Sequence, residues 1–151
     1  MVATDLSSNR CAAEMIETIP AIMRFLRSKV KDHAGASASM PQIRVLGFLN
    51  ENPGASLSKV SEHLGVSNAT ASSIVDRLVH KGLVERREHA AERRFVELKL
   101  TPDGDRQFQE LHFHASSELS AVLKDLPDAK VAQVIDAMNT LKNLFQDKEI
   151  S

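Results

Sequence analysis

The sequence lacks tryptophan and tyrosine altogether and has a single cysteine among its 151 residues. One cysteine excludes an internal disulfide framework and fits a reducing cytoplasm. Proteins that stack single-stranded bases rely on aromatic side chains, so this composition argues against that mode of nucleic-acid binding. No run of about 18 apolar residues is present, so we expect no membrane-spanning segment. The N-terminus also lacks the basic start and apolar core of a secretory signal.

A strong excess of either charge is missing as well. With 19 basic and 20 acidic residues the net charge is -1, which excludes a globally basic nucleic-acid binder. The charges are unevenly distributed, because residues 76–99 hold seven basic and five acidic residues while residues 100–151 hold five and nine. The sequence therefore predicts a local anion-binding surface after residue 75 and a different function for the acidic C-terminal third.

Motifs of catalytic sites are missing too. The sequence has no nucleophile elbow, phosphate-cradling glycine loop, HExxH motif or close pair of catalytic carboxylates, so we expect no enzyme activity and no cofactor. His112 and His114 would point about 200° apart on a helix, so they cannot chelate one metal ion together, and we predict no metal site. Two alternatives stay open, namely a metal bound by histidines that folding brings together and a redox role for Cys11.

What the sequence does have is a succession of apolar stripes at helical spacing. The first, from about Cys11 to Lys31, contains Pro20, which either starts the helix or kinks it. Ser39 with Gln42 forms a capping box for a second helix, which the run NENPGA stops. Further helices are predicted, in order, from Ser56 or Ser58, from Ser67 to about Lys81, from Thr101 or Asp103 to about Leu126, and around Val131–Phe145.

Glycines and strand-like runs organise the middle of the chain. Gly65 separates two short predicted helices where a tight turn needs a positive φ, and Gly82 closes the second helix. Two strand-like runs, residues 83–88 and 94–100, flank the polar loop HAAERR and form a hairpin that we call the wing. This order predicts a mainly α fold with a small β-hairpin, arranged as a winged helix-turn-helix.

The predicted helix that starts at Ser67 has an unusual outer side. No charged residue lies between positions 67 and 75, and the side carries Asn68, Ala69, Ser72 and Ser73. Short side chains let a helix approach the floor of a DNA groove, and hydroxyls and amides both donate to and accept from bases or phosphates. An ordinary solvated helix face usually carries more Glu and Lys, so the pattern favours contact with DNA.

Asp76 is the exception on this side, because a carboxylate there would repel phosphate unless it is paired. Arg77, or an arginine of the wing, could neutralise it. Such a pair would fix the angle of the wing rather than add much stability, since exposed ion pairs contribute little. We therefore predict that Asp76 braces the wing.

The apolar stripes near both ends of the chain exceed what a small winged module can cover, and one exposed stripe is more than a soluble monomer usually shows. Within a single domain of residues 1–151, we assign residues 1–35 and 101–151 to a helical dimerisation lobe and residues 36–100 to a DNA-binding lobe. A two-fold homodimer would place two DNA-binding surfaces on a palindrome and strengthen modest half-site affinity.

Three segments, in this order and with these flanking helices, resemble the MarR (multiple antibiotic resistance regulator) family. They read SMPQIRVLGFL, LSKVSEHLGVSNATASSIVDRLVHKGLVERR and ERRFVELKLTPDGD. The resemblance covers nearly the whole chain. It implies a sequence-specific transcriptional regulator, most readily a repressor, that binds a pseudo-palindromic double-stranded DNA operator as a homodimer.

The resemblance also assigns roles to residues. It implies that the fourth predicted helix enters the major groove, that arginines at the wing tip enter the minor groove, and that Asp76 matches the acid that braces the wing. The tip departs from the family pattern, since Glu92 replaces the usual Asp and the common Pro-Asp turn is missing, which predicts a shorter or more mobile tip. The residues expected to contact DNA are Ser58, Ser67, Asn68, Thr70, Ser72, Ser73, Arg77, Arg93 and Arg94.

A small aromatic or anionic effector is a further implication, since many relatives sense such a molecule between the two lobes. We expect Arg24, Arg27 and His33 to meet a carboxylate there, against the alternative of an ordinary solvated face. Two other kinds of protein stay open, namely a winged-helix protein-interaction module and a redox- or metal-responsive regulator. The interaction module would not require the hydroxyl-rich helix and the arginine-rich tip together.

Overall fold

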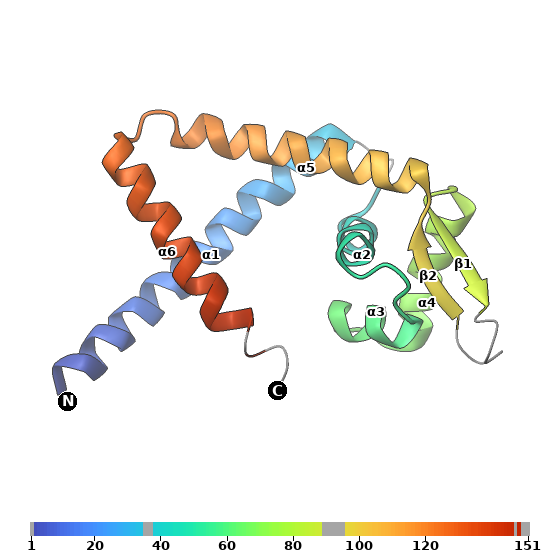
Figure 1. Cartoon of the computed structure of the whole chain (residues 1–151), viewed down its shortest axis with the longest axis horizontal. Helices are drawn as coiled ribbons and strands as arrows, with labels where there is room; N and C mark the ends of the chain where they lie inside the picture. The colour runs from blue at the N-terminus through green and yellow to red at the C-terminus, as the bar shows by residue number, and fades with distance from the viewer. Residues whose placement is uncertain (1, 35–37, 89–95, 147, 149–151) are drawn as a thin grey trace. The chain divides into compact units, whose positions relative to one another are not determined.

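The computed structural model describes residues 2–34, 38–88, 96–146 and 148. Its elements follow in the order α1 (Val2–Ala34), α2 (Met40–Glu51), α3 (Leu57–Leu64), α4 (Asn68–His80), β1 (Val84–Glu88), β2 (Val96–Leu100), α5 (Pro102–Leu123) and α6 (Asp128–Gln146) (Figure 1). The chain divides into two compact units, residues 1–115 and 116–151. A mainly α fold with one antiparallel hairpin confirms the predicted fold class.

The core of the first unit lies where α2, α3, α4 and the wing meet (Figure 1). The predicted inward faces of these elements are buried there. They supply Val45, Leu46, Leu49, Val60, Leu64, Ala71, Val75, Leu78, Leu83, Val84 and Leu98. Full burial of one such aliphatic side chain contributes about 1.5–3 kcal/mol. Helices as short as α3 and α4 are marginal alone, so this shared core holds them in place.

Polar caps begin the helices of the core where predicted. The Ser39 hydroxyl accepts from the Gln42 N–H and the Gln42 side chain accepts from the Ser39 N–H, which confirms the capping box. Of the two candidates for α3, Ser56 is the cap. Gly65 ends α3 at φ 69°, a left-handed conformation that glycine adopts without a Cβ clash. Ser67 caps α4.

The two described strands lie within the predicted strand-like runs and pair antiparallel, with Arg86 opposite Leu98. The wing is also tied to the chain segment before α3. The Leu98 N–H donates to the Ala55 carbonyl at 2.9 Å, and the Gly54 N–H donates to the Leu98 carbonyl at 2.9 Å. The base of the wing and the start of the helix-turn-helix are therefore held by backbone bonds as well as by the core.

α1 is longer than predicted. It spans Val2–Ala34, whereas apolar spacing indicated a helix from about Cys11 to Lys31. The segment before Cys11 is polar and not periodic, but it contains no proline or glycine to prevent a helix, so periodicity alone missed it. Pro20 lies inside the helix and does not start it, since one proline removes a single backbone N–H donor.

α5 begins directly after Thr101, which settles its cap in favour of Thr101 over Asp103. The Thr101 hydroxyl accepts from the Gly104 N–H at 3.0 Å and donates to the Gly82 carbonyl at 2.6 Å. Its backbone N–H donates to the Leu83 carbonyl at 3.1 Å. These bonds fix the start of α5 to the turn between α4 and β1. α5 ends at Leu123, a little before the predicted position.

The second unit consists of the end of α5 and α6. α6 follows the predicted stripe, yet no α6 residue that the structure describes is buried in the single chain. Many large apolar side chains of α6 and of the residues just before it stay exposed, namely Val122, Leu123, Leu126, Val134, Ile135, Met138, Leu144 and Phe145. Exposed apolar surface of this extent is typical of interaction sites. None of the described helices is long and apolar enough to cross a membrane.

Candidate nucleic-acid interface

α4 has one buried and one exposed face, as its sequence pattern predicts. Ala71, Val75 and Leu78 are fully buried in the core. Ser72 is half-buried, and the remaining predicted contact residues of the helix, Asn68, Thr70, Ser73 and Arg77, are exposed, as is the predicted wing brace Asp76. The exposed side therefore offers amide and hydroxyl groups on short side chains at the start of the helix and charge only from its middle onward.

Ser67 and Thr70 share a hydrogen-bond network at the start of α4. The Ser67 hydroxyl accepts from the Thr70 N–H at 3.2 Å and donates to the Thr70 hydroxyl oxygen at 3.0 Å. Because the Thr70 hydroxyl accepts in this network, its own hydrogen can point to a base edge or a phosphate. Ser67 therefore serves the helix cap in addition to any contact with a ligand.

The partner of Asp76 is Arg86 of β1, whose guanidinium makes a hydrogen-bonded ion pair with the Asp76 carboxylate. The pair joins the exposed side of α4 to the wing. It satisfies the expectation that a wing arginine, one of two options, neutralises Asp76. A pair with this degree of exposure contributes at most about 1 kcal/mol to stability, so its main effect is on geometry.

Arg86 was missed as a site residue, although a signal for it was present. Side chains alternate across a strand, so Arg86 shares the sheet face of the buried Val84 and of its cross-strand neighbour Leu98. That face is the one packed against the helices. Alternation from Val84 would therefore have selected Arg86, rather than Arg87, as the arginine that meets α4.

A cavity of about 320 Å³ lies where α3, α4 and the wing converge. It brings together two predicted contact residues, Ser58 and Ser72, with the guanidinium of Arg86. The rest of its lining is Ser56 with the apolar side chains Leu57, Val96 and Leu98. The cavity thus combines one cation, several hydroxyls and an apolar wall.

Arg77 belongs to a second, more open hollow at the other end of α4. It is lined by Arg77, His80, Lys81, Asp76, Ser39 and Gln42. The Lys81 ammonium donates to the Gln42 side-chain carbonyl at 2.9 Å, which ties the end of α4 to the start of α2. The positive side chains therefore lie at the C-terminal end of α4 and not on its uncharged part.

Comparison with known proteins identifies this arrangement. The MarR family model matches residues 38–94, which run from α2 to the wing. The chain is 26% identical over 148 residues to the uncharacterized HTH-type transcriptional regulator YfiV of Bacillus subtilis (strain 168), a match covering 95% of this chain and 92% of that protein. Residues 38–94 of the chain are thus similar to the MarR family.

Two further comparisons agree with this similarity. The HTH-type transcriptional repressor MdtR of Bacillus subtilis (strain 168) is 27% identical over 92 residues, which are 61% of this chain and 59% of MdtR. A solved MarR family protein from Bacillus stearothermophilus shares the fold, with a TM-score of 0.79, 21% identity, and coverage of 91% of this chain and 97% of that one. The chain is thus a helix-turn-helix transcriptional regulator that binds DNA.

The predicted wing-tip contacts, Arg93 and Arg94, lie outside the described residues, as does Glu92. Their assignment to the minor groove stays a prediction. The described part of the wing supplies its base, held by Leu98 and Arg86.

The predicted effector residues line neither of the two cavities above. Arg24 and Arg27 are exposed on α1. His33 stacks on His114 of α5, with ring centroids 4.2 Å apart. Folding therefore does bring two distant histidines together, but among the described residues no group of three or more potential metal ligands forms. Cys11 is exposed.

Proposed function

We propose that the chain is a MarR family regulator, a cytoplasmic repressor that binds a pseudo-palindromic double-stranded DNA operator as a homodimer. The observation that carries the proposal is the outer side of α4, which is uncharged from position 67 to 75 and joined to the wing by the Asp76–Arg86 pair. The similar protein MdtR is named as a repressor. Selection of duplexes from a randomised library, followed by affinity measurement, tests the proposal.

Each part of the DNA-binding lobe, residues 36–100, has a role in this proposal. The short polar side chains of α4 meet base edges in the major groove, where hydroxyls and amides discriminate between base pairs. Arg93 and Arg94 at the wing tip enter the minor groove, where cations are attracted. The base-edge contacts are Asn68, Thr70, Ser72 and Ser73, and the phosphate contacts are Ser58, Ser67 and Arg77.

The homodimer is supported by the apolar surface that the single chain leaves exposed. α6 and the residues before it expose eight large apolar side chains, and α1 exposes Ile16, Ile19, Ile22 and Met23. Burial of such surface is worth about 25 cal/mol per Å². A two-fold pairing of residues 1–35 and 101–151 would cover these side chains and present two α4 helices to one operator.

Asp76→Asn tests whether Asp76 braces the wing, because the two possible roles of Asp76 change DNA affinity in opposite directions. Loss of a carboxylate beside DNA should by itself strengthen binding, because phosphates repel it. If Asp76 positions Arg86 and the wing, the variant should instead bind the selected duplex about tenfold more weakly, which corresponds to about 1.4 kcal/mol. Fluorescence anisotropy with a labelled duplex measures the change.

Two comparisons accompany that measurement. Thermal unfolding of Asp76→Asn should differ little from wild type, because Asp76 and Arg86 side chains are 59% and 38% exposed. Asp103→Asn, which removes an exposed acid paired with Arg106 in α5, should leave DNA affinity unchanged. Tighter binding by Asp76→Asn would show that the carboxylate only repels DNA and does not brace the wing.

We also propose that a small aromatic carboxylate acts as effector in the cavity lined by Arg86, Ser58 and Ser72. The guanidinium suits a carboxylate and the apolar wall suits a ring. Since Arg86 also holds Asp76, a carboxylate there would compete for Arg86 and loosen the wing. Calorimetry should detect benzoate binding to wild type and to Arg24→Gln, and none to Arg86→Gln. The reverse pattern would favour the α1 residues Arg24, Arg27 and His33 as the effector site.

A further inference from the structure

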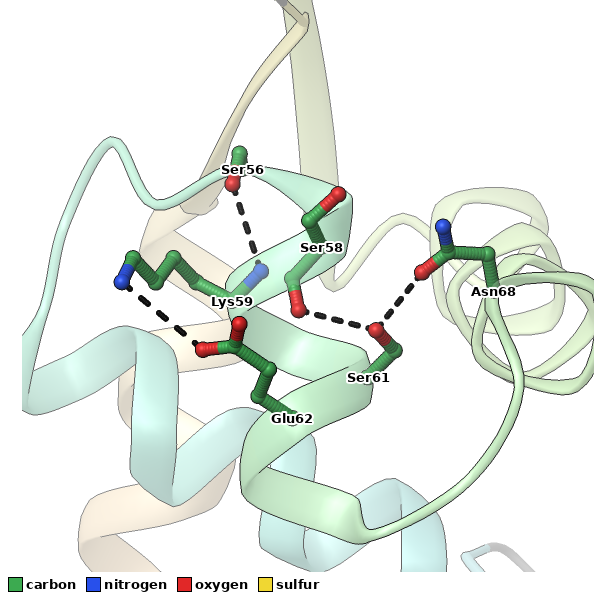
Figure 2. Close-up of polar contacts among 6 residues, drawn as sticks. All are labelled: Ser56, Ser58, Lys59, Ser61, Glu62 and Asn68. Atoms are coloured by element: carbon green, nitrogen blue, oxygen red, sulfur yellow. Dashed lines mark hydrogen bonds and ion pairs between the residues drawn. The ribbon is translucent and has the colours of Figure 1, made fainter.

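α4 is held at both of its ends by side-chain contacts to other helices of the DNA-binding lobe. At its start, the Ser61 hydroxyl of α3 lies 2.6 Å from the Asn68 side-chain amide and 2.8 Å from the Ser58 carbonyl (Figure 2). At its end, the Lys81 ammonium donates to the Gln42 side-chain carbonyl of α2 at 2.9 Å. The direction of α4 relative to α2 and α3 is therefore set before any DNA is bound.

The hollow between the end of α4 and the start of α2 carries an excess of positive charge. Arg77 and Lys81 each bring one positive charge to it, and His80 brings a ring N–H donor. Asp76 brings a carboxylate, but this carboxylate is paired with Arg86 of the wing. We call this surface the α2–α4 hollow, and its lining is Ser39, Gln42, Asp76, Arg77, His80 and Lys81.

Gln42 holds Lys81 without adding an opposite charge. It is only 6% exposed, and its side-chain carbonyl also accepts from the Ser39 N–H in the capping box. A glutamate could serve the same capping box. It would, however, pair its charge with that of the lysine, as Glu62 does with Lys59 on α3 (Figure 2). The neutral amide therefore orders Lys81, which lowers the entropy that this side chain loses when it binds a ligand.

The spacing along α4 places this hollow at the edge of a DNA groove. Ser73 and His80 lie on the same exposed side of α4, about 10 Å apart along the helix axis. The major groove of B-DNA is about 12 Å wide, and phosphates border it. When the uncharged start of α4 meets base edges, the end of the helix therefore reaches the border of the groove, where the anion is a backbone phosphate.

We propose that the α2–α4 hollow binds one backbone phosphate of each operator half-site, with Lys81 and Arg77 as charged ligands and Gln42 as a positioning residue. The proposal rests on the proposed function, in which α4 lies in the major groove. It adds a backbone contact at the end of α4 that adjoins α2. Free inorganic phosphate offers the same oxygens, so calorimetry with that ion distinguishes the two sources.

Methylphosphonate scanning of the selected duplex tests this contact in the full-length protein. Each backbone position in turn carries a neutral methylphosphonate, and fluorescence anisotropy measures the affinity. Wild type should lose about tenfold at one position in each half-site, because charge-assisted contacts are lost there. At that position Lys81→Gln should lose only about threefold, because Arg77 alone then meets the phosphate. At other positions the two proteins should lose equally.

Two further variants separate charge from structure on the unmodified duplex. Gln42→Glu keeps the cap and the contact to Lys81 but adds a carboxylate to the hollow, so it should bind about tenfold more weakly. Lys81→Arg keeps the charge and should keep the methylphosphonate effect of wild type. Lys124→Gln, which removes an exposed lysine outside the DNA-binding lobe, is the matched control and should behave as wild type.

Two results would overturn the inference and leave the proposed function intact. One is a Lys81→Gln variant that loses as much as wild type at every methylphosphonate position. The other is calorimetric binding of inorganic phosphate to wild type but not to Lys81→Gln without any such position, which would assign the hollow to a free anion. Failure of wild type to select any duplex would overturn the proposed function and the inference with it.

Discussion

Met138→Glu is expected to convert the proposed homodimer into monomers and to lower affinity for the full operator by at least about a hundredfold. Met138 is 52% exposed in the single chain and lies on the apolar stripe of α6 with Val134 and Ile135. In a dimer the introduced carboxylate would be buried against apolar side chains without a partner. The free-energy cost of this burial exceeds the gain from a single packing contact. A dimer binds both half-sites of the operator at once. When it separates into monomers, the gain in affinity from this double contact is lost.

Sedimentation velocity and anisotropy measure these two effects separately. The variant should sediment as a monomer and should bind a duplex holding one half-site about as well as wild type. Asn143→Glu, which introduces the same carboxylate on a side of α6 away from Met138, should stay dimeric with wild-type affinity. A Met138→Glu protein that remains dimeric and keeps its operator affinity would place the dimer surface elsewhere than on this stripe.

Gly104→Ala should destabilise the fold more than any single change on the surface. A Cβ at Gly104 would lie 2.0 Å from the Leu83 carbonyl oxygen and 2.9 Å from its carbonyl carbon. Both groups are backbone, and the Leu83 carbonyl also accepts from the Thr101 N–H, so no rotamer change relieves the clash. We expect a loss of about 3 kcal/mol, seen as a fall in Tm of about 10 °C.

Gly47→Ala is the matched control for this change. Its Cβ would approach only the Phe108 side chain, at 3.3 Å from Cε2, and a ring edge can shift slightly. In a helix interior alanine also gains up to about 1 kcal/mol over glycine. This variant should therefore unfold within about 1 kcal/mol of wild type. Equal unfolding temperatures for the two variants would show that α5 is not packed on Leu83 as described.

The parts of the fold that sequence predicted correctly are those set by local chemistry. The capping box of Ser39 and Gln42, the turn at Gly65 and the cap at Ser67 each follow from residues within a few positions of one another. The start of α1 was missed, because polar residues without periodicity neither form an apolar stripe nor break a helix.

The parts of the site that sequence did not predict depend on contacts between elements. Arg86 meets Asp76 only once the strand register is known. Ser61 reads as an ordinary helix residue until the packing of α3 on α4 brings its hydroxyl to Asn68. The stacking of His33 on His114 joins residues from α1 and α5 that no spacing rule connects.

The central claim is that this chain recognises a particular duplex through α4 and the wing. Its most direct test is an anisotropy titration of the wild-type protein with the library-selected duplex and with a scrambled duplex of the same composition, at several salt concentrations. The account predicts that the selected duplex binds at least about a thousandfold more tightly and that both affinities fall as salt rises. Equal affinity for the two duplexes, or no binding to either at low salt, would contradict it.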